Sequence, residues 1–228
     1  RAGPLNDLFE LSCDLAVSAI PESMQSLSLK KKKDALPPAS DNQVSQIVDY
    51  LFEKMPIPEA EVFWHKDVLD MRVARTGPPV LLVQKNLLKK DLHEVLFRCA
   101  REMAMLRPEH LFSASFRDPT QRLQQASRLI AALRCVSNRA PMKVNRDVQT
   151  LATQLRHELK DNQVQALGGM FEKIDAGQQH HLDVERWLKG LEFTADRVGL
   201  IFTNSLEHAL HVIDGTPSSV SLSTKEER

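Results

Sequence analysis

The sequence is organised around the stretch Val95-Leu96-Phe97-Arg98-Cys99-Ala100-Arg101-Glu102-Met103-Ala104-Met105. Apolar residues recur in it at intervals of three and four, which predicts an amphipathic helix over about residues 89 to 106. Pro108 is expected to end that helix. Just upstream, the run Val80-Leu81-Leu82-Val83 is continuously apolar, which is typical of a strand buried on both faces. The segment therefore predicts a buried strand followed by a helix that packs on it.

Two further short segments near this strand are rich in β-forming residues, namely 61–65 and 69–74. Together the three segments predict a small three-stranded sheet. Elsewhere the apolar spacing is helical, and the remaining helices are expected at residues 5–20, 41–52, 119–135, 145–159, 163–174, 183–196 and 205–212. The expected fold is therefore α+β and mostly helical.

Composition sets the expected domain organisation. Residues 1–40 are expected to form an N-terminal helix and an exposed lysine-rich connection, because four lysines at 30–33 lie among serines and prolines. Residues 41–214 are expected to form one compact domain. Residues 215–228 carry little apolar content, which predicts a disordered tail.

The charge balance and hydropathy exclude two classes of partner. The 228 residues include thirty basic and thirty acidic side chains, so the formal net charge is zero. Because phosphate binding relies on a basic excess, nucleic acid is not expected as a partner. No apolar run approaches the roughly 18 residues of a membrane span. The chain starts at Arg1 rather than Met, so we expect it to be a piece of a longer protein.

The three cysteines, Cys13, Cys99 and Cys135, are widely separated and lie outside any metal-binding spacing. Each has apolar neighbours in a helical pattern, so each is expected to be a small buried hydrophobic residue. Free thiols favour a reducing compartment, and the expected location is cytoplasmic.

A second stretch far downstream, Glu192-Phe193-Thr194-Ala195-Asp196-Arg197-Val198-Gly199, completes a pattern with the first. The order of a short sheet whose edge strand lies at 80–83, the turn Asn86-Leu87-Leu88 and the helix at 95–105 resembles gluzincin metallopeptidases of the HtpX and CAAX-protease type. In that family a strand leads to a GLL turn and to a helix reading V-L-A-H-E-L-G-H. A later helix of the family reads E-x-x-A-D-R-x-G. The resemblance implies a zincin-like organisation over about residues 80 to 200.

The departures from the family pattern fall on the zinc ligands. In the family, two histidines at i and i+4 bind zinc, a glutamate between them activates water, and a distant glutamate completes the coordination. Here Arg101 and Met105 occupy the histidine positions, and neither a guanidinium nor a thioether is a suitable zinc ligand. The resemblance assigns the base position to Glu102, the third-ligand position to Glu192, and the supporting carboxylate to Asp196. No metal and no cofactor are therefore expected.

The retained acids suggest a different use for this site. We expect Arg101 to place its charge near the vacated metal position and to pair with Glu192, with Glu102 or Asp196 sharing the charge. The alternative is that Arg101 and Glu102 are ordinary exposed helix residues.

Other metal sites are poorly supported. The pairs His180-His181 with Glu185, and His208 with His211, have spacings that place two nitrogens near each other, but no cysteine or carboxylate cluster accompanies them.

These observations lead to three functional hypotheses. The leading one is a catalytically inactive, metallopeptidase-like module of a larger, bacterial protein, acting in protein–protein interaction or scaffolding. Its partner would be another protein or other domains of the same longer chain. The alternatives are an active metal-dependent hydrolase with a non-standard site and a purely structural helical domain.

Overall fold

The structure is a computed structural model that describes residues 3–13, 22–36, 42–114, 116, 118–139, 144–176 and 182–215. The chain divides into two compact units, each made of two segments. One unit contains residues 1–21 and 108–188, and the other contains residues 22–107 and 189–228. These boundaries differ from the expected single domain over 41–214, because each unit gathers helices from distant parts of the chain. The predicted disordered tail at 215–228 lies outside the described residues except for residue 215.

The unit of residues 22–107 and 189–228 contains the small sheet. Its strands are β1 (Glu61–Trp64), β2 (Met71–Ala74) and β3 (Val80–Val83), in the order β1-β3-β2. β1 runs parallel to β3 with Glu61 opposite Val80, and β2 runs antiparallel to β3 with Met71 opposite Val83. β3 is therefore the central strand and not the expected edge strand, because both β1 and β2 pair with it. All four residues of β3 are buried, as its continuous apolar run predicted.

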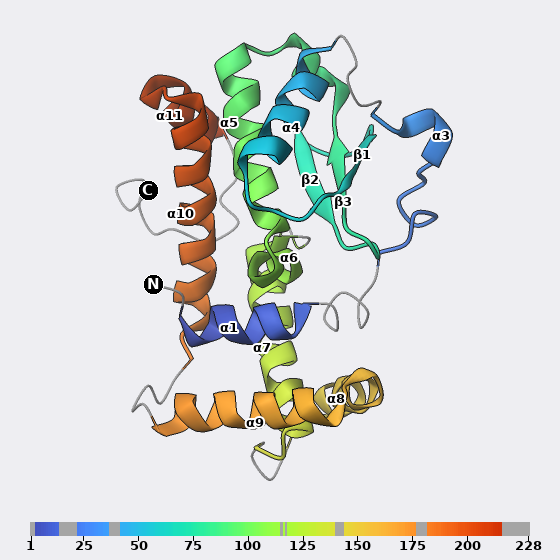
Figure 1. Cartoon of the computed structure of the whole chain (residues 1–228), viewed down its shortest axis with the longest axis vertical. Helices are drawn as coiled ribbons and strands as arrows, with labels where there is room; N and C mark the ends of the chain where they lie inside the picture. The colour runs from blue at the N-terminus through green and yellow to red at the C-terminus, as the bar shows by residue number, and fades with distance from the viewer. Residues whose placement is uncertain are drawn as a thin grey trace. The chain divides into compact units, whose positions relative to one another are not determined.

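α4 (Gln43–Lys54) precedes the sheet in this unit, and η1 (Lys85–Lys89), α5 (Leu92–Met103) and η2 (Ala104–Leu106) follow it (Figure 1). α4 is capped by Asn42, whose side chain accepts a hydrogen bond from Ser45 N. The 3₁₀ turn η1 leads to α5, which Asp91 caps in the same way. α5 passes directly into η2, a second 3₁₀ turn.

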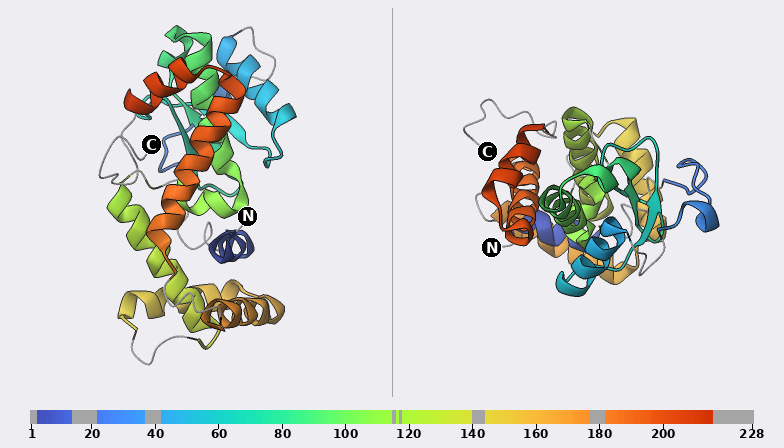
Figure 2. Two further views of the ribbon diagram at one scale, coloured as in Figure 1. Left: turned by 90° about the vertical axis from the view of Figure 1, so that its left-hand side faces the viewer. Right: turned by 90° about the horizontal axis from the view of Figure 1, so that it is seen from above.

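Two C-terminal helices contact α5, α11 (Leu206–Gly215) along its length and α10 (Val184–Thr203) at Gly199 (Figure 2). The residues of α10 from Lys189 onward belong to this unit, as does α11. The turn between the two helices contains Asn204 with a left-handed backbone (φ 48°). The buried side chain of Phe97 on α5 packs against Ala209 and Val212 of α11.

The lysine-rich segment is an ordered arm rather than a free connection over residues 22–36. Lys30–Lys33 are exposed, and the short helix α3 (Lys31–Asp34) carries three of these lysines. However, Leu27 is buried in the same cluster as Phe63 of β1, and Leu36 N donates a hydrogen bond to Val62 O. The apolar residues between the serines and lysines explain this, because they dock the arm on the sheet while the charged residues face solvent.

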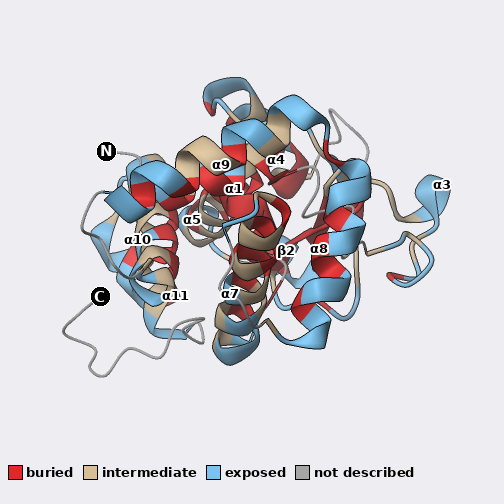
Figure 3. Cartoon of the chain, turned by 90° about the horizontal axis from the view of Figure 1, so that it is seen from below, coloured by how far each residue is buried: buried red, intermediate tan, exposed pale blue. Residues whose placement is uncertain are grey.

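The other unit is helical in its described part. It contains α1 (Pro4–Leu11), α6 (Pro108–Ala114), α7 (Pro119–Val136), α8 (Arg146–Glu158) and α9 (Asp161–Ala176), together with the first residues of α10. Their apolar faces form one core, to which α7 contributes Leu129 and Leu133 and α8 contributes Leu151 and Leu155. Figure 3 shows the resulting pattern on α8, where a buried face alternates with an exposed one.

The predicted fold class, α+β and mostly helical, is therefore confirmed. The exceptions are local. Pro108 ends one helical segment but also begins α6, since proline is well tolerated in the first turn of a helix. α10 continues seven residues beyond the predicted end at Asp196, through Gly199, because its packing against α5 outweighs the low helix propensity of glycine.

Candidate functional site

The predicted site residues come from two helices, α5 and α10. On α10, Glu192, Ala195, Asp196 and Gly199 recur at intervals of three and four, which places them on one face of the helix. At Gly199 this face approaches α5 so closely that a Cβ atom there would lie 2.8 Å from the Phe97 ring and 3.1 Å from the Phe97 carbonyl oxygen. The absent side chain of Gly199 therefore permits the close packing of the two helices.

Arg101 on α5 lies between the two acids of α10. Its Nη2 donates a hydrogen bond of 2.5 Å to Glu192 Oε2, and its Nε donates one of 2.6 Å to Asp196 Oδ1. The three side chains are only 16%, 9% and 12% exposed, respectively. The predicted pairing of Arg101 with Glu192 and Asp196 is thus confirmed, and the alternative of an exposed arginine is excluded.

The electrostatics of this cluster favour the charged arginine. Burial alone lowers the pKa of the Arg101 guanidinium, but the charges of Glu192 and Asp196, the hydrogen bond to Asp196 and the charge of Glu102 raise it above its ordinary value. Arg101 therefore stays a cation throughout the pH range in which proteins are folded. The guanidinium acts as a fixed positive charge that joins α5 to α10.

Glu102, the neighbour of Arg101, is turned toward the sheet. Its Oε1 accepts a hydrogen bond of 2.9 Å from the backbone N–H of Val73 on β2. β2 pairs only with β3 among the described strands, so this N–H lies on the free edge of the sheet, and Val73 is fully buried. Glu102 therefore provides the acceptor for a buried amide that the sheet does not pair.

Met105, the fifth predicted site residue, lies outside the regular helix. α5 ends at Met103, and Met105 is a buried residue of η2, only 4% exposed. In an α-helix, residues i and i+4 differ by about 40° around the axis, but two 3₁₀ steps widen the difference to about 80°. Position 105 is thus rotated away from the direction in which a second ligand of an α-helical site would point.

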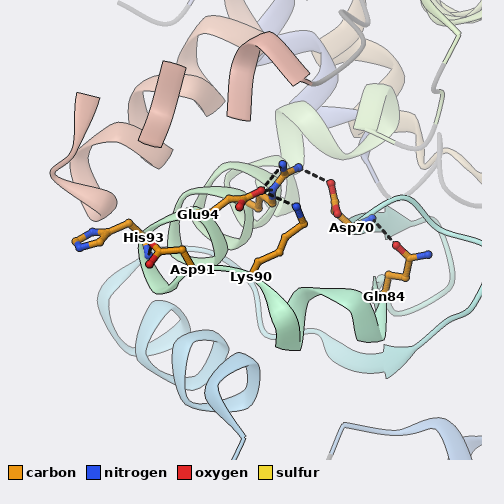
Figure 4. A network of polar contacts seen from close by, with 7 residues as sticks. Asp70, Gln84, Lys90, Asp91, His93 and Glu94 are labelled. Atoms are coloured by element: carbon orange, nitrogen blue, oxygen red, sulfur yellow. Dashed lines mark hydrogen bonds and ion pairs between the residues drawn. The ribbon is translucent and has the colours of Figure 1, made fainter. Parts of the chain in front are cut away.

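A network of charged groups fixes the start of α5 to the turn before β2 (Figure 4). Arg98 forms ion pairs with Glu94 on the same helix and with Asp70, and Lys90 pairs with Glu94 at 2.7 Å. Burial opposes ionisation of Glu94, but the hydrogen bonds and charges of Lys90 and Arg98 outweigh it and lower the pKa of this carboxyl group. The network orients α5, and hence Arg101, relative to the sheet.

Of the histidine candidates, His208 and His211 lie within the described residues, and His208 contacts groups of α5 and α11. His208 Nε2 lies 3.4 Å from Asp91 Oδ1, its Nδ1 lies 2.7 Å from Ser205 Oγ, and its ring centroid lies 4.9 Å from that of His93. These contacts join the start of α11 to the start of α5, and His211 is exposed. His180 and His181 lie outside the described residues. Within the described ranges, no three His, Cys, Asp or Glu side chains are grouped in a way that suits a metal ion.

Cys13 and Cys99 are buried, as predicted, whereas Cys135 is only partly buried. Cys99 is fully buried in α5, and burial raises the pKa of its thiol to about 12. Burial also raises the pKa of Cys135. Because the thiolate is the reactive form, the Cys99 thiol is chemically inert at neutral pH.

The arrangement as a whole joins α5 to α10 and to the edge of the sheet. The two acids that face Arg101 are engaged by its guanidinium, and Glu102 accepts a hydrogen bond from the sheet. Sequence reasoning missed the partner of Glu102, since a bond to a backbone amide 29 residues away has no local signature. It also missed the role of Gly199, although the spacing of Ala195 and Gly199 indicated a close helix contact.

In the part of the chain that the structure describes, no helix is both long and apolar enough to cross a membrane. Comparison of the chain with protein-family models, with curated proteins and with solved structures found no match.

Proposed function

We propose that this chain is a catalytically inactive, metallopeptidase-like module that acts in protein–protein interaction or scaffolding within a larger protein. The observation that supports the proposal is the position of the Arg101 guanidinium between Glu192 and Asp196. In the gluzincin pattern, these two acids correspond to the third zinc ligand and to its supporting carboxylate. A single buried cation thus takes over the structural role that a metal ion has between the same two helices.

One other feature supports the same origin. The small residues Ala195 and Gly199 of the second motif lie on the face of α10 that meets α5. These contacts give Glu192, Ala195, Asp196 and Gly199 of the E-x-x-A-D-R-x-G pattern a packing or pairing role that does not depend on zinc, whereas Arg197 is exposed.

Loss of the ligands leaves the module without hydrolytic chemistry. A catalytic zinc site needs three protein ligands and an open position for water. With Arg101 and Met105 in place of the histidines, only Glu192 remains as a ligand, and its carboxylate is occupied. The module would therefore bind its partner through its surface.

The experiment that tests this proposal is a metal analysis of the purified chain after dialysis against zinc, combined with a casein-cleavage assay. We expect neither stoichiometric zinc nor cleavage. Stoichiometric zinc together with chelator-sensitive cleavage would overturn the proposal in favour of an active hydrolase with a non-standard site.

A further inference from the structure

The exposed lysines of α3 form a basic projection beside the sheet, away from the Arg101 cluster on α5. Lys30, Lys31, Lys32 and Lys33 are all exposed, and Figure 3 shows α3 as an exposed segment. Lys31 pairs with Glu61 at 2.5 Å, with both side chains largely in solvent. Among the described residues, Lys30, Lys32 and Lys33 have no acidic side chain as an ion-pair partner. The projection thus presents positive charge that the fold itself does not neutralise.

The backbone of this projection is held in a defined conformation. Asp34 Oδ2 accepts a hydrogen bond of 2.8 Å from Lys30 N, which closes the turn around the lysines. On the N-terminal side, His65 Nε2 lies 2.9 Å from Leu27 O, and on the C-terminal side Ala35 forms a β-bridge with Phe63. The arm is therefore attached to β1 or the residue after it on both sides of the lysines, and a partner that binds there would not have to order the backbone first.

The apolar side chains of the arm are used in docking it. Met24, Leu27, Leu29 and Ala35 all pack into the cluster with Phe63. Binding at a bilayer surface relies on an apolar face that enters the lipid in addition to basic residues. The arm's own apolar residues are turned toward the sheet, which disfavours a membrane as the partner.

The side-chain types of Lys30–Lys33 also discriminate between the two remaining classes of partner, nucleic acid and acidic polypeptide. It contains four lysines and no arginine or aromatic residue. Arginine provides the planar fork that suits phosphate, and aromatic side chains stack on bases, whereas lysine is a flexible point charge. The neutral charge of the whole chain also gives no long-range attraction for nucleic acid. A partner with several closely spaced carboxylates matches these properties best.

We propose that the projection at Lys30–Lys33 is a docking surface for an acidic polypeptide segment rich in aspartate or glutamate. The partner's carboxylates pair with the lysine ammonium groups in any of several registers, because lysine imposes no fixed geometry. The interaction is weak at physiological salt and stronger at low salt, since exposed ion pairs are screened. This docking surface is independent of the Arg101 cluster and stands whether or not the module descends from a peptidase.

The test measures binding of a fluorescently labelled ten-residue glutamate peptide to the full chain by anisotropy, at low and at physiological salt. The quadruple variant Lys30→Gln/Lys31→Gln/Lys32→Gln/Lys33→Gln is expected to bind about tenfold or more weakly, because it loses four exposed ion pairs. The double variant Lys32→Gln/Lys33→Gln leaves the Lys31–Glu61 pair intact and should show an intermediate loss.

A matched control removes four other exposed lysines with the same change in net charge: Lys85→Gln/Lys89→Gln/Lys160→Gln/Lys173→Gln. Its affinity for the glutamate peptide should stay within about twofold of the wild type. An equal loss in the control would overturn the proposal, as would absence of binding to the wild type at low salt. Tighter binding to phosphatidylserine vesicles or to single-stranded DNA, with the same loss in the quadruple variant, would overturn the assignment to an acidic polypeptide.

Discussion

Replacing Arg101 by methionine is the perturbation that the structure describes in most detail. The variant keeps an unbranched apolar side chain but removes the charge and both hydrogen bonds to Glu192 and Asp196. Because those two side chains are only 9% and 12% exposed, their carboxylates would be left buried without the cation. Breaking a buried pair in this way costs about 3 to 5 kcal/mol. The partial exposure of Arg101 places the expected loss near the lower limit, at about 3 kcal/mol.

The free energy of unfolding is measured by urea denaturation. The chain has two tryptophans, and all variants carry Trp187→Phe so that Trp64, at the end of β1, reports on the unit that contains Arg101. The control is Arg197→Met, which removes an exposed arginine from α10 and should change stability by less than about 0.5 kcal/mol. The difference in the free energy of unfolding between the Arg101 variant and its parent should persist at high salt, because salt screens buried ion pairs only weakly. A loss below about 0.5 kcal/mol for Arg101→Met would refute the reasoning.

Three further predictions concern Glu102, Gly199 and Cys99. Glu102→Ala leaves the buried amide of Val73 without its acceptor and should lower the free energy of unfolding by about 1 to 3 kcal/mol. Glu102→Gln keeps an acceptor and should lower it less. Faster hydrogen exchange of the Val73 amide in the alanine variant alone would verify this. Gly199→Ala places a methyl group 2.8 Å from the Phe97 ring and should lower the free energy of unfolding, measured in urea, by about 1 to 2 kcal/mol. Gly190→Ala, on the same helix, places its methyl group in open space and should raise the free energy of unfolding by up to about 1 kcal/mol. The pKa of Cys99 is raised to about 12, so its contribution to stability is complete below the unfolded thiol's pKa of about 8.5 and is lost as pH rises from there toward 12. This loss reaches about 2 kcal/mol at pH 10, and a Cys99→Ala variant whose stability declines as steeply with pH would contradict the assignment.

The parts of the fold that follow from local pattern were predictable. The continuous apolar run of β3 predicts a strand that is buried on both faces. The spacing of apolar residues by three and four in α7, α8 and α9 predicts helices that are buried on one face. The end of α10 was not predictable from propensity, because Gly199 is helical only through its contact with Phe97. The contact of residues 22–36 with the sheet was not predicted, although the expected exposure of the lysines is observed. The composition is that of a loop, but Leu27 packs with Phe63 and Leu36 is buried.

The candidate site likewise contains features that were predicted and features that depend on contacts between distant elements. The pairing of Arg101 with two acids about ninety residues away was expected from the resemblance to the gluzincin pattern, and the structure contains it. The displacement of Met105 into η2 and the bond from Val73 to Glu102 depend on how α5 ends and on where it meets the sheet. Neither feature has a signal in the order of residues, because both result from contacts between elements distant in the chain.

The central proposal is that Arg101, between Glu192 and Asp196, stands in place of the cation of a former zinc site between α5 and α10. A zinc titration of Arg101→His/Met105→His tests it most directly, with the wild type and the same variant carrying Glu192→Gln measured alongside. The two histidines and Glu192 would supply three ligands once η2 rewinds into an α-helix, and three protein ligands are enough for a zinc site. The account predicts one zinc ion per chain in the double variant, much weaker binding with Glu192→Gln, and none in the wild type. A folded double variant that binds no zinc would contradict the account and favour a purely structural helical domain.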